Sequence, residues 1–125
     1  VLHLAYLWIV VGFMLTALAS LGLLAPPLAL HAFTVGGLGA MIYGMMSRVA
    51  LGHTGRRLHP SALTVGGYVS INLAAAIRVF GPLLLPAATL QATVISGALW
   101  ILAFLAFLLG YGGMLISPRV DGRAG

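Results

Sequence analysis

The first 47 residues of this chain contain no Asp, Glu, Lys or Arg. A helix needs about 20 mainly apolar residues to cross a bilayer, so this stretch is long enough to cross twice. Only seven of the 125 residues are charged, six Arg and one Asp, whereas a soluble domain devotes roughly a quarter of its residues to charge. This composition excludes a soluble enzyme, a disordered chain and a nucleic-acid-binding domain, because too little polar material is present to cover a surface in water. We therefore expect an integral membrane protein whose first partner is the lipid bilayer.

Prolines and one polar loop divide the chain into four apolar segments. Paired prolines at 26 and 27 interrupt the uncharged stretch, and Pro82 and Pro86 mark the end of the third segment. The prediction is an all-α, polytopic membrane protein, with four transmembrane helices in an up-down bundle that forms a single domain over residues 1–125. The predicted helices are 2–24, 28–51, 61–85 and 88–116, with a loop at 52–60 and a polar tail at 117–125.

Arginine placement predicts the orientation of this bundle. Five of the six arginines lie at one end, in or next to the loop and in the tail: Arg48, Arg56, Arg57, Arg119 and Arg123. The two turns at the other end carry no charge. Arginine is enriched in cytoplasmic loops, so we expect the loop and the tail in the cytoplasm. Tyr6, Trp8 and Tyr111 would then form an aromatic belt at that interface.

Arg78 is the exception, because it lies within the third predicted helix. It is about seven residues from the outer end of that helix, roughly 10 Å deep at 1.5 Å per residue. The one acid of the chain, Asp121, is predicted on the other side of the membrane. Two interpretations follow: Arg78 extends to the outer headgroups, or it pairs with an anionic ligand or with an acid outside this chain.

The four histidines divide between the two sides of the membrane. His31 lies in the first turn of the second helix, in the same half as Arg78, whereas His3, His53 and His59 lie on the cytoplasmic side. The chain has no Cys, so a metal would be held by His or by Met sulfur. Imidazole binds haem iron, copper or zinc. A single His at a helix end is more often a hydrogen-bonded residue, and both interpretations stay open.

Small residues dominate the second predicted helix. They are Gly36, Gly37, Gly39, Ala40 and Gly44. Small residues allow close helix packing in lipid. The alternative is that a flat cofactor lies against the glycine face.

Several blocks of the chain resemble the NnrS family. The most specific block is His31-Ala-Phe-Thr-Val-Gly-Gly-Leu-Gly-Ala-Met41, followed by Leu51-Gly-His-Thr-Gly-Arg56. The stretch 99–104 and the ending 118–125 are also similar to the family. Arg57 and Ala124 depart from the family pattern, since Pro is common at both positions.

The resemblance implies a haem- and copper-associated, multi-pass protein of the bacterial inner (cytoplasmic) membrane that takes part in the response to nitric oxide. The matched histidines are His31 and His53. Family members have about twelve helices, so we expect this chain, which begins without Met, to be a C-terminal part that packs against remaining N-terminal helices. We predict a cofactor site at His31 and Arg78, with His31, His53 and His59 as the candidate metal residues. The alternative is a membrane transporter or a structural bundle without a metal cofactor.

Overall fold

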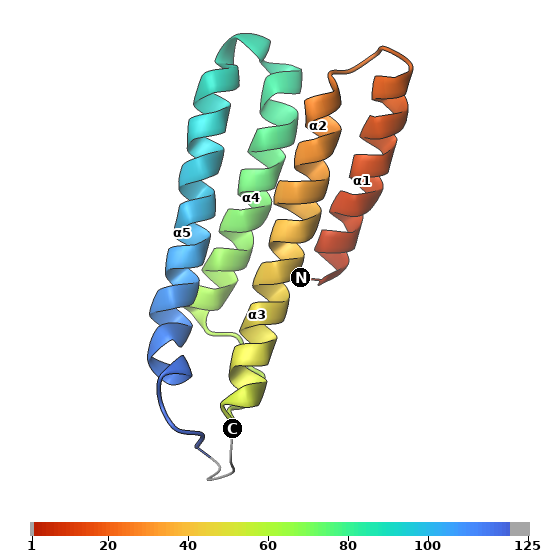
Figure 1. Ribbon diagram of the computed structural model, residues 1–125. Coiled ribbons are helices and arrows are strands. Elements are labelled where there is room, and N and C mark those ends of the chain that lie inside the picture. The colour runs from red at the N-terminus through yellow and green to blue at the C-terminus, as the bar shows by residue number, and fades with distance from the viewer. Residues whose placement is uncertain (1, 121–125) are drawn as a thin grey trace.

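Four long apolar helices, each able to span a membrane, contain most of the residues that the structure describes, 2–120. In this computed structural model the helices alternate in direction, and short connections join them (Figure 1). The spans are Leu2–Ser20, Pro26–His53, Ala62–Leu84 and Pro86–Leu115. The predicted all-α bundle of four membrane-spanning helices is confirmed. Asp121 and Arg123, which the sequence places in the tail, lie outside the described residues.

The second span consists of three consecutive segments. Helix α1 (Leu2–Ser20) precedes it, and the span itself runs through α2 (Pro26–His31), the π-helical segment η1 (Ala32–Leu38) and α3 (Gly39–His53). In η1 the backbone hydrogen bonds join residues five apart instead of four, so that the Gly39 amide donates to the Thr34 carbonyl. Such π-helical segments are rare and often occur at functional sites. The sequence analysis did not predict this one.

The other two spans form the most extensive helix pair of the bundle. They are α4 (Ala62–Leu84) and α5 (Thr89–Leu115), and the short 3₁₀ segment η2 (Pro86–Ala88) joins them. Helix α4 also packs against α2, η1 and α3. It therefore connects α5 with the second span.

Glycines with positive φ end two helices where the sequence analysis expected other boundaries. Gly22 (φ +73°) follows the end of α1, and the Leu23 amide donates to the Leu18 carbonyl. Gly55 (φ +72°) ends α3 in the same way. This bonding pattern is a Schellman motif, in which glycine tolerates the left-handed conformation. Helix α1 therefore stops four residues earlier than predicted, and α3 continues two residues further.

Prolines begin helices more often than they end them in this fold. Pro26 and Pro27 occupy the first turn of α2, where a missing amide hydrogen is harmless. Pro86 likewise begins η2. Pro82 lies inside the last turn of α4, which continues to Leu84. The helix therefore ends one residue before the predicted boundary at 85.

Aromatic side chains fill the space beside the helix glycines. A Cβ atom on Gly36 would come within 2.5 Å of the Trp8 ring, and one on Gly12 within 2.6 Å of the Phe33 ring. At Gly67 a Cβ atom would overlap the Tyr43 side chain. In the second span, Gly36, Gly37 and Gly39 are thus covered by the side chains of Trp8, Ile9 and Trp100. This arrangement favours the packing interpretation over a flat cofactor lying there.

Two residues assigned to an interfacial aromatic belt are instead packed between helices. Trp8 is 8% exposed and donates from Nε1 to Asn72 Oδ1 at 3.0 Å. Tyr111 is 2% exposed and shares a 2.9 Å hydrogen bond with the Thr64 hydroxyl. The belt prediction is wrong for these two residues, because each ring supplies an interhelical contact. Tyr6 is exposed.

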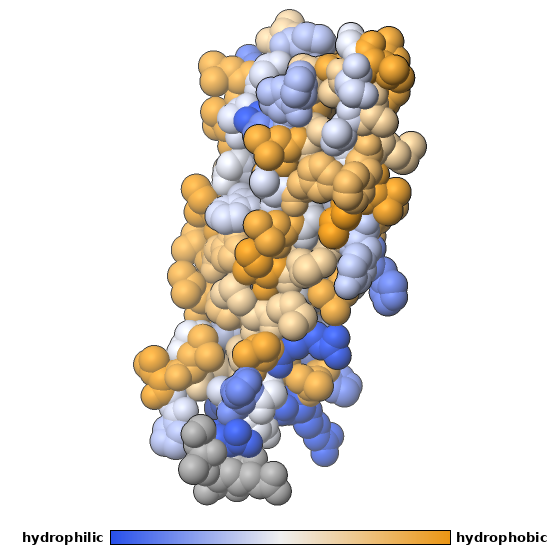
Figure 2. All heavy atoms as spheres, turned by 45° about the vertical axis from the view of Figure 1, so that its right-hand side comes forward, coloured by the Kyte–Doolittle hydropathy of each residue, from blue (hydrophilic) through white to orange (hydrophobic). Residues whose placement is uncertain are grey.

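Polar and apolar side chains separate along the long axis of the molecule. Apolar residues cover the middle of the face shown in Figure 2, and the most hydrophilic ones gather near the grey tail. We call the end that holds residues 54–61 and 116–120 the basic end. The opposite end holds the connections 21–25 and 85–88 (Figure 1).

Candidate functional site

Arg78 lies on α4 toward the opposite end and is half-buried. It lies six residues before the end of α4, or about 9 Å at 1.5 Å per residue. Its Nη1 donates to the Thr93 hydroxyl on α5 at 2.9 Å, and that hydroxyl donates in turn to the Thr89 carbonyl. No Asp or Glu occurs at positions 2–120. The guanidinium is therefore oriented by a neutral group and has no carboxylate partner among the described residues.

A cleft of about 340 Å³ opens beside Arg78, mainly between α4 and α5. Its walls combine one cation, two hydroxyls and apolar side chains: Val35, Arg78, Thr93, Ser96, Gly97, Trp100 and Ile101. Ser96 is already engaged, since its hydroxyl donates to the Ala74 carbonyl at 2.8 Å. A pocket with apolar walls and few polar groups is the usual form of a cofactor or ligand site. Arg78 is the group that would select an anionic ligand there.

His31 is the last residue of α2 and directly precedes η1. It is half-buried and lies near enough to Arg78 for an electrostatic interaction between the two side chains. The packing of α2 against α4 accounts for this proximity. The structure thus brings together the two residues that the sequence analysis assigned to a cofactor site.

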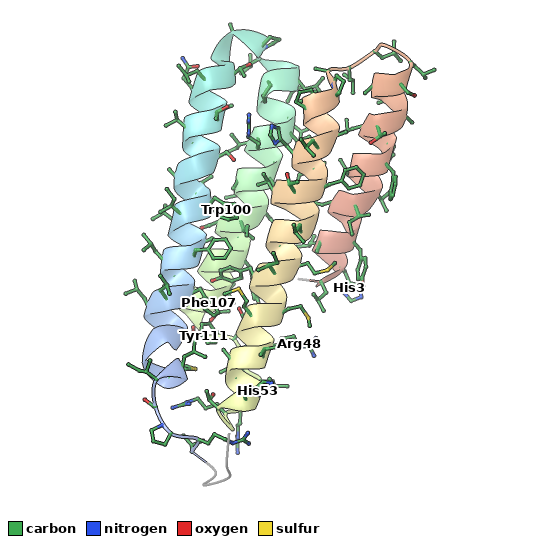
Figure 3. All side chains as sticks on the ribbon, viewed as in Figure 1. His3, Arg48, His53, Trp100, Phe107 and Tyr111 are labelled. Atoms are coloured by element: carbon green, nitrogen blue, oxygen red, sulfur yellow. The ribbon has the colours of Figure 1, made fainter. Side chains whose placement is uncertain are left out.

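The other histidines lie toward the basic end, and all three are exposed. His53 ends α3, His59 lies in the following loop, and His3 lies near the start of α1 (Figure 3). Within residues 2–120, no three His, Asp or Glu side chains are close enough to hold a metal ion together. His31 lies in the first half of the second span, whereas His53 and His59 lie at the basic end, so these three histidines do not form one metal site.

Arg48 is a feature whose surroundings the sequence analysis missed. It projects from α3 five residues before the helix end, and Figure 3 shows it on the same helix as His53. Its side chain lines three clefts, one with His53 and Arg119, one with His3, and one with Tyr68 and Tyr111. The sequence signal was an arginine inside an apolar helix, but its neighbours come from segments distant in the chain.

Tyr43 is a second missed feature. Its side chain is fully buried, and within the part of the chain that the structure describes its hydroxyl has no hydrogen-bond partner. Its ring packs edge-on against Tyr68, Phe104 and Phe107, with centroids 5.1 to 6.1 Å apart. These rings form the core between α3, α4 and α5, to which Trp100 adds a contact with Phe104.

Comparison with known proteins gives one clear result. A family model described as NnrS protein matches residues 1–119, nearly the entire chain. No curated protein and no solved structure matches it. The match confirms the resemblance seen in the sequence, and together with four apolar spans it identifies a multi-pass membrane protein. The chain belongs to the NnrS protein family.

Proposed function

We propose that this NnrS family protein holds a haem at the opposite end, between His31 and Arg78, and acts in the response of a bacterium to nitric oxide. The observation that carries the proposal is the environment of the Arg78 side chain. A half-buried guanidinium lines a largely apolar cleft with a neutral hydroxyl as its partner, and it lies within electrostatic range of the His31 imidazole, which does not itself line that cleft. An ionisable residue within a membrane span is by default a functional-site hypothesis.

The residue types at this site fit the chemistry of haem. Histidine is a common axial ligand of haem iron, and a guanidinium can bind a propionate carboxylate through two parallel hydrogen bonds. The apolar side chains of Val35, Trp100 and Ile101 line the adjacent cleft and suit a hydrophobic macrocycle. A haem held there would supply an iron to which nitric oxide can bind.

The residues of this chain would then have distinct roles. Arg78 holds the carboxylate, and Thr93 fixes the guanidinium through the 2.9 Å hydrogen bond. Trp100 and Ile101 exclude water from the cleft. The π-helical segment η1 directly follows His31 and leads into α3. It would therefore hold His31 in place relative to the rest of the span.

Copper, which the resemblance also implies, has less support among these residues. His53 and His59, both exposed toward the basic end, are its candidate ligands here, and no group of three His, Asp or Glu side chains occurs among residues 2–120 to complete a site. We propose that the remaining N-terminal helices supply the further ligands. A haem- and copper-associated protein of this kind would reside in the bacterial inner membrane.

The test is the absorption spectrum of the protein purified from its membrane. We expect a Soret band, a haem content near one per protein by solvent extraction, and a shift of the band when nitric oxide is added. Elemental analysis of the same sample measures copper. A protein free of haem, when expressed with an ample haem supply, would overturn the proposal in favour of a transporter or a structural bundle.

A further inference from the structure

We propose that a groove between α1 and α4 binds a long-chain fatty acid, whose carboxylate is held by Arg48 and Tyr68. The groove has a volume of about 490 Å³ and is larger than the cleft beside Arg78, which measures about 340 Å³. The proposed fatty acid site is separate from the proposed haem site, since it involves neither His31 nor Arg78.

The walls of this groove are almost entirely apolar. Four exposed aliphatic side chains on α1 and α4 supply most of them: Leu4, Val65, Val69 and Leu73. Asn72 also lines the groove, but its Oδ1 accepts from Trp8 Nε1 and its Nδ2 donates to the Tyr68 carbonyl at 2.8 Å. A hydrocarbon chain can therefore fill the groove and gain van der Waals contacts along it, whereas a soluble ion would find few polar partners there.

The groove runs from the middle of α1 and α4 toward the basic end. Helix α1 packs against α2, η1 and α3, and the Trp8–Asn72 hydrogen bond joins it to α4. Leu4 lies about one turn from Trp8, and Val65 lies about two turns from Asn72, each toward the basic end. A chain in the groove would thus lie along α4 with one end near the polar residues at the basic end.

Arg48 faces two smaller clefts that adjoin the groove at this end. Their volumes are about 200 and 260 Å³, and both share Pro60 and Tyr68 with the groove. Arg48 comes from α3 and Tyr68 from α4, so the two side chains line the same spaces from different helices. His3 lines the larger of the two clefts, and Figure 3 shows it on the same side of α3 as Arg48. The groove and these clefts together are apolar along α4 and polar at Arg48.

The polar groups at this end favour an anion. No Asp or Glu occurs at positions 2–120 to neutralise Arg48, and within these residues neither its guanidinium nor the Tyr68 hydroxyl makes a hydrogen bond. A carboxylate can accept two parallel hydrogen bonds from a guanidinium, and a phenol hydroxyl can donate a third. Arg48 lies five residues before the end of α3, about 7.5 Å at 1.5 Å per residue. This depth suits a head group at the edge of a bilayer.

The size of the site favours a fatty acid over a phospholipid. A phospholipid brings two acyl chains and a bulky head group, whereas one apolar groove is present here and the clefts at Arg48 are small. A carboxylate is planar and carries a single charge, which one guanidinium balances. A fatty acid therefore matches the site in charge, in head-group size and in the number of chains.

Native mass spectrometry of the purified protein, after mild delipidation, tests this proposal with oleate as the probe. We expect one oleate per protein, and we expect oleyl alcohol, which has the same chain without the carboxylate, to bind about tenfold more weakly. Arg48→Gln should weaken oleate binding about tenfold, and Tyr68→Phe, which removes only the hydroxyl, about threefold. Val69→Phe should remove most of the binding, because the larger side chain occupies the groove.

Two controls match these variants. Arg57→Gln removes the same charge from an exposed loop residue that lines none of these three spaces. Val94→Phe makes the same enlargement at an exposed position of α5 that also lines none of them. Both variants should bind oleate like the parent.

Several results would overturn the proposal. Equal binding of oleate and oleyl alcohol, or unchanged oleate binding in folded Arg48→Gln and Tyr68→Phe proteins, would mean that these residues do not hold the carboxylate. If the controls lose as much binding as their counterparts, oleate partitions without a specific site. If phosphatidylglycerol displaces oleate at equal concentration, the occupant is a phospholipid, and if no oleate binds, the groove is not a fatty acid site. Should Arg48→Gln fail to fold by size-exclusion chromatography, Tyr68→Phe, which keeps the ring packed against Tyr43, decides alone.

Discussion

At the scale of single residues, the free-energy cost of inserting Arg78 into the membrane bears directly on the proposed function. An arginine inside a membrane span makes the free energy of membrane insertion less favourable by up to about 2.5–3.5 kcal/mol. We predict that Arg78→Gln reaches normal membrane levels but loses haem, because the amide cannot form the paired, charge-assisted contact to a carboxylate. Arg78→Lys should be intermediate, since it keeps the charge without the fork. Haem per protein and growth under nitric oxide are the measurements.

The alternative interpretation, in which Arg78 extends to the lipid headgroups, predicts the opposite result. If the guanidinium only extends to the headgroups, Lys would serve as well as Arg, and Gln would insert more easily with no loss of function. A Gln variant that equals the parent in both haem content and growth would assign Arg78 to the membrane interface.

Gly67 shows how closely the core of the bundle is packed. A methyl group there would overlap the Tyr43 side chain, which three other aromatic rings hold in place. We predict that Gly67→Ala lowers the free energy of unfolding by about 1–3 kcal/mol through overpacking. Thermal unfolding in detergent measures the change.

The adjacent Gly66 provides the control for this prediction. It is exposed and has open space around its missing Cβ atom. Gly66→Ala should leave stability unchanged or raise it by up to about 1 kcal/mol, because alanine favours helix more than glycine does. Equal losses in the two variants would mean that the contact with Tyr43 does not determine the effect.

At the scale of helices, the Trp8–Asn72 hydrogen bond is the clearest link between α1 and α4. Its 3.0 Å donor–acceptor distance and the burial of Trp8 predict a favourable coupling free energy. A double-mutant cycle with Trp8→Phe and Asn72→Leu should give about 0.6 kcal/mol, the average for polar contacts between membrane helices. Additive effects of the two substitutions would show that the bond contributes nothing to the packing of α1.

The number and approximate positions of the helices were predictable from the sequence, because uncharged stretches of this length have few other stable structures in lipid. The ends were less predictable. The proline pair at 26–27 predicts a helix that continues to residue 24, whereas α1 ends at Ser20, just before the left-handed Gly22. The π-helical turn in η1, where Gly36 and Gly37 pack against α1, was not predictable either.

The candidate site was predictable in part, for a similar reason. Alternating helix directions place His31 and Arg78 in the same half of the membrane, and the structure brings them within electrostatic range. The rotation of each helix was not predictable, because α1 is apolar on all sides and a lipid-facing residue resembles a buried one. Trp8 was therefore assigned to the surface, and the neighbours of Arg48 were missed.

At the scale of the whole molecule, the orientation in the membrane remains a prediction from arginine placement. The chain has no Cys, so single cysteines can be labelled without background. We predict that Ser117→Cys at the basic end reacts only from the cytoplasm and Ala25→Cys at the opposite end only from outside. Both residues are exposed and uncharged. Labelling of both cysteines from one side would refute the up-down arrangement.

The central claim is that this NnrS family protein binds haem through His31. The most direct measurement is the haem content of the purified His31→Ala protein, with His3→Ala as the matched control. His3 is an exposed imidazole toward the basic end, whereas His31 lies near Arg78. We predict that His31→Ala loses most of its haem and that His3→Ala keeps the parent amount. A folded His31→Ala protein with the full haem content would contradict the claim.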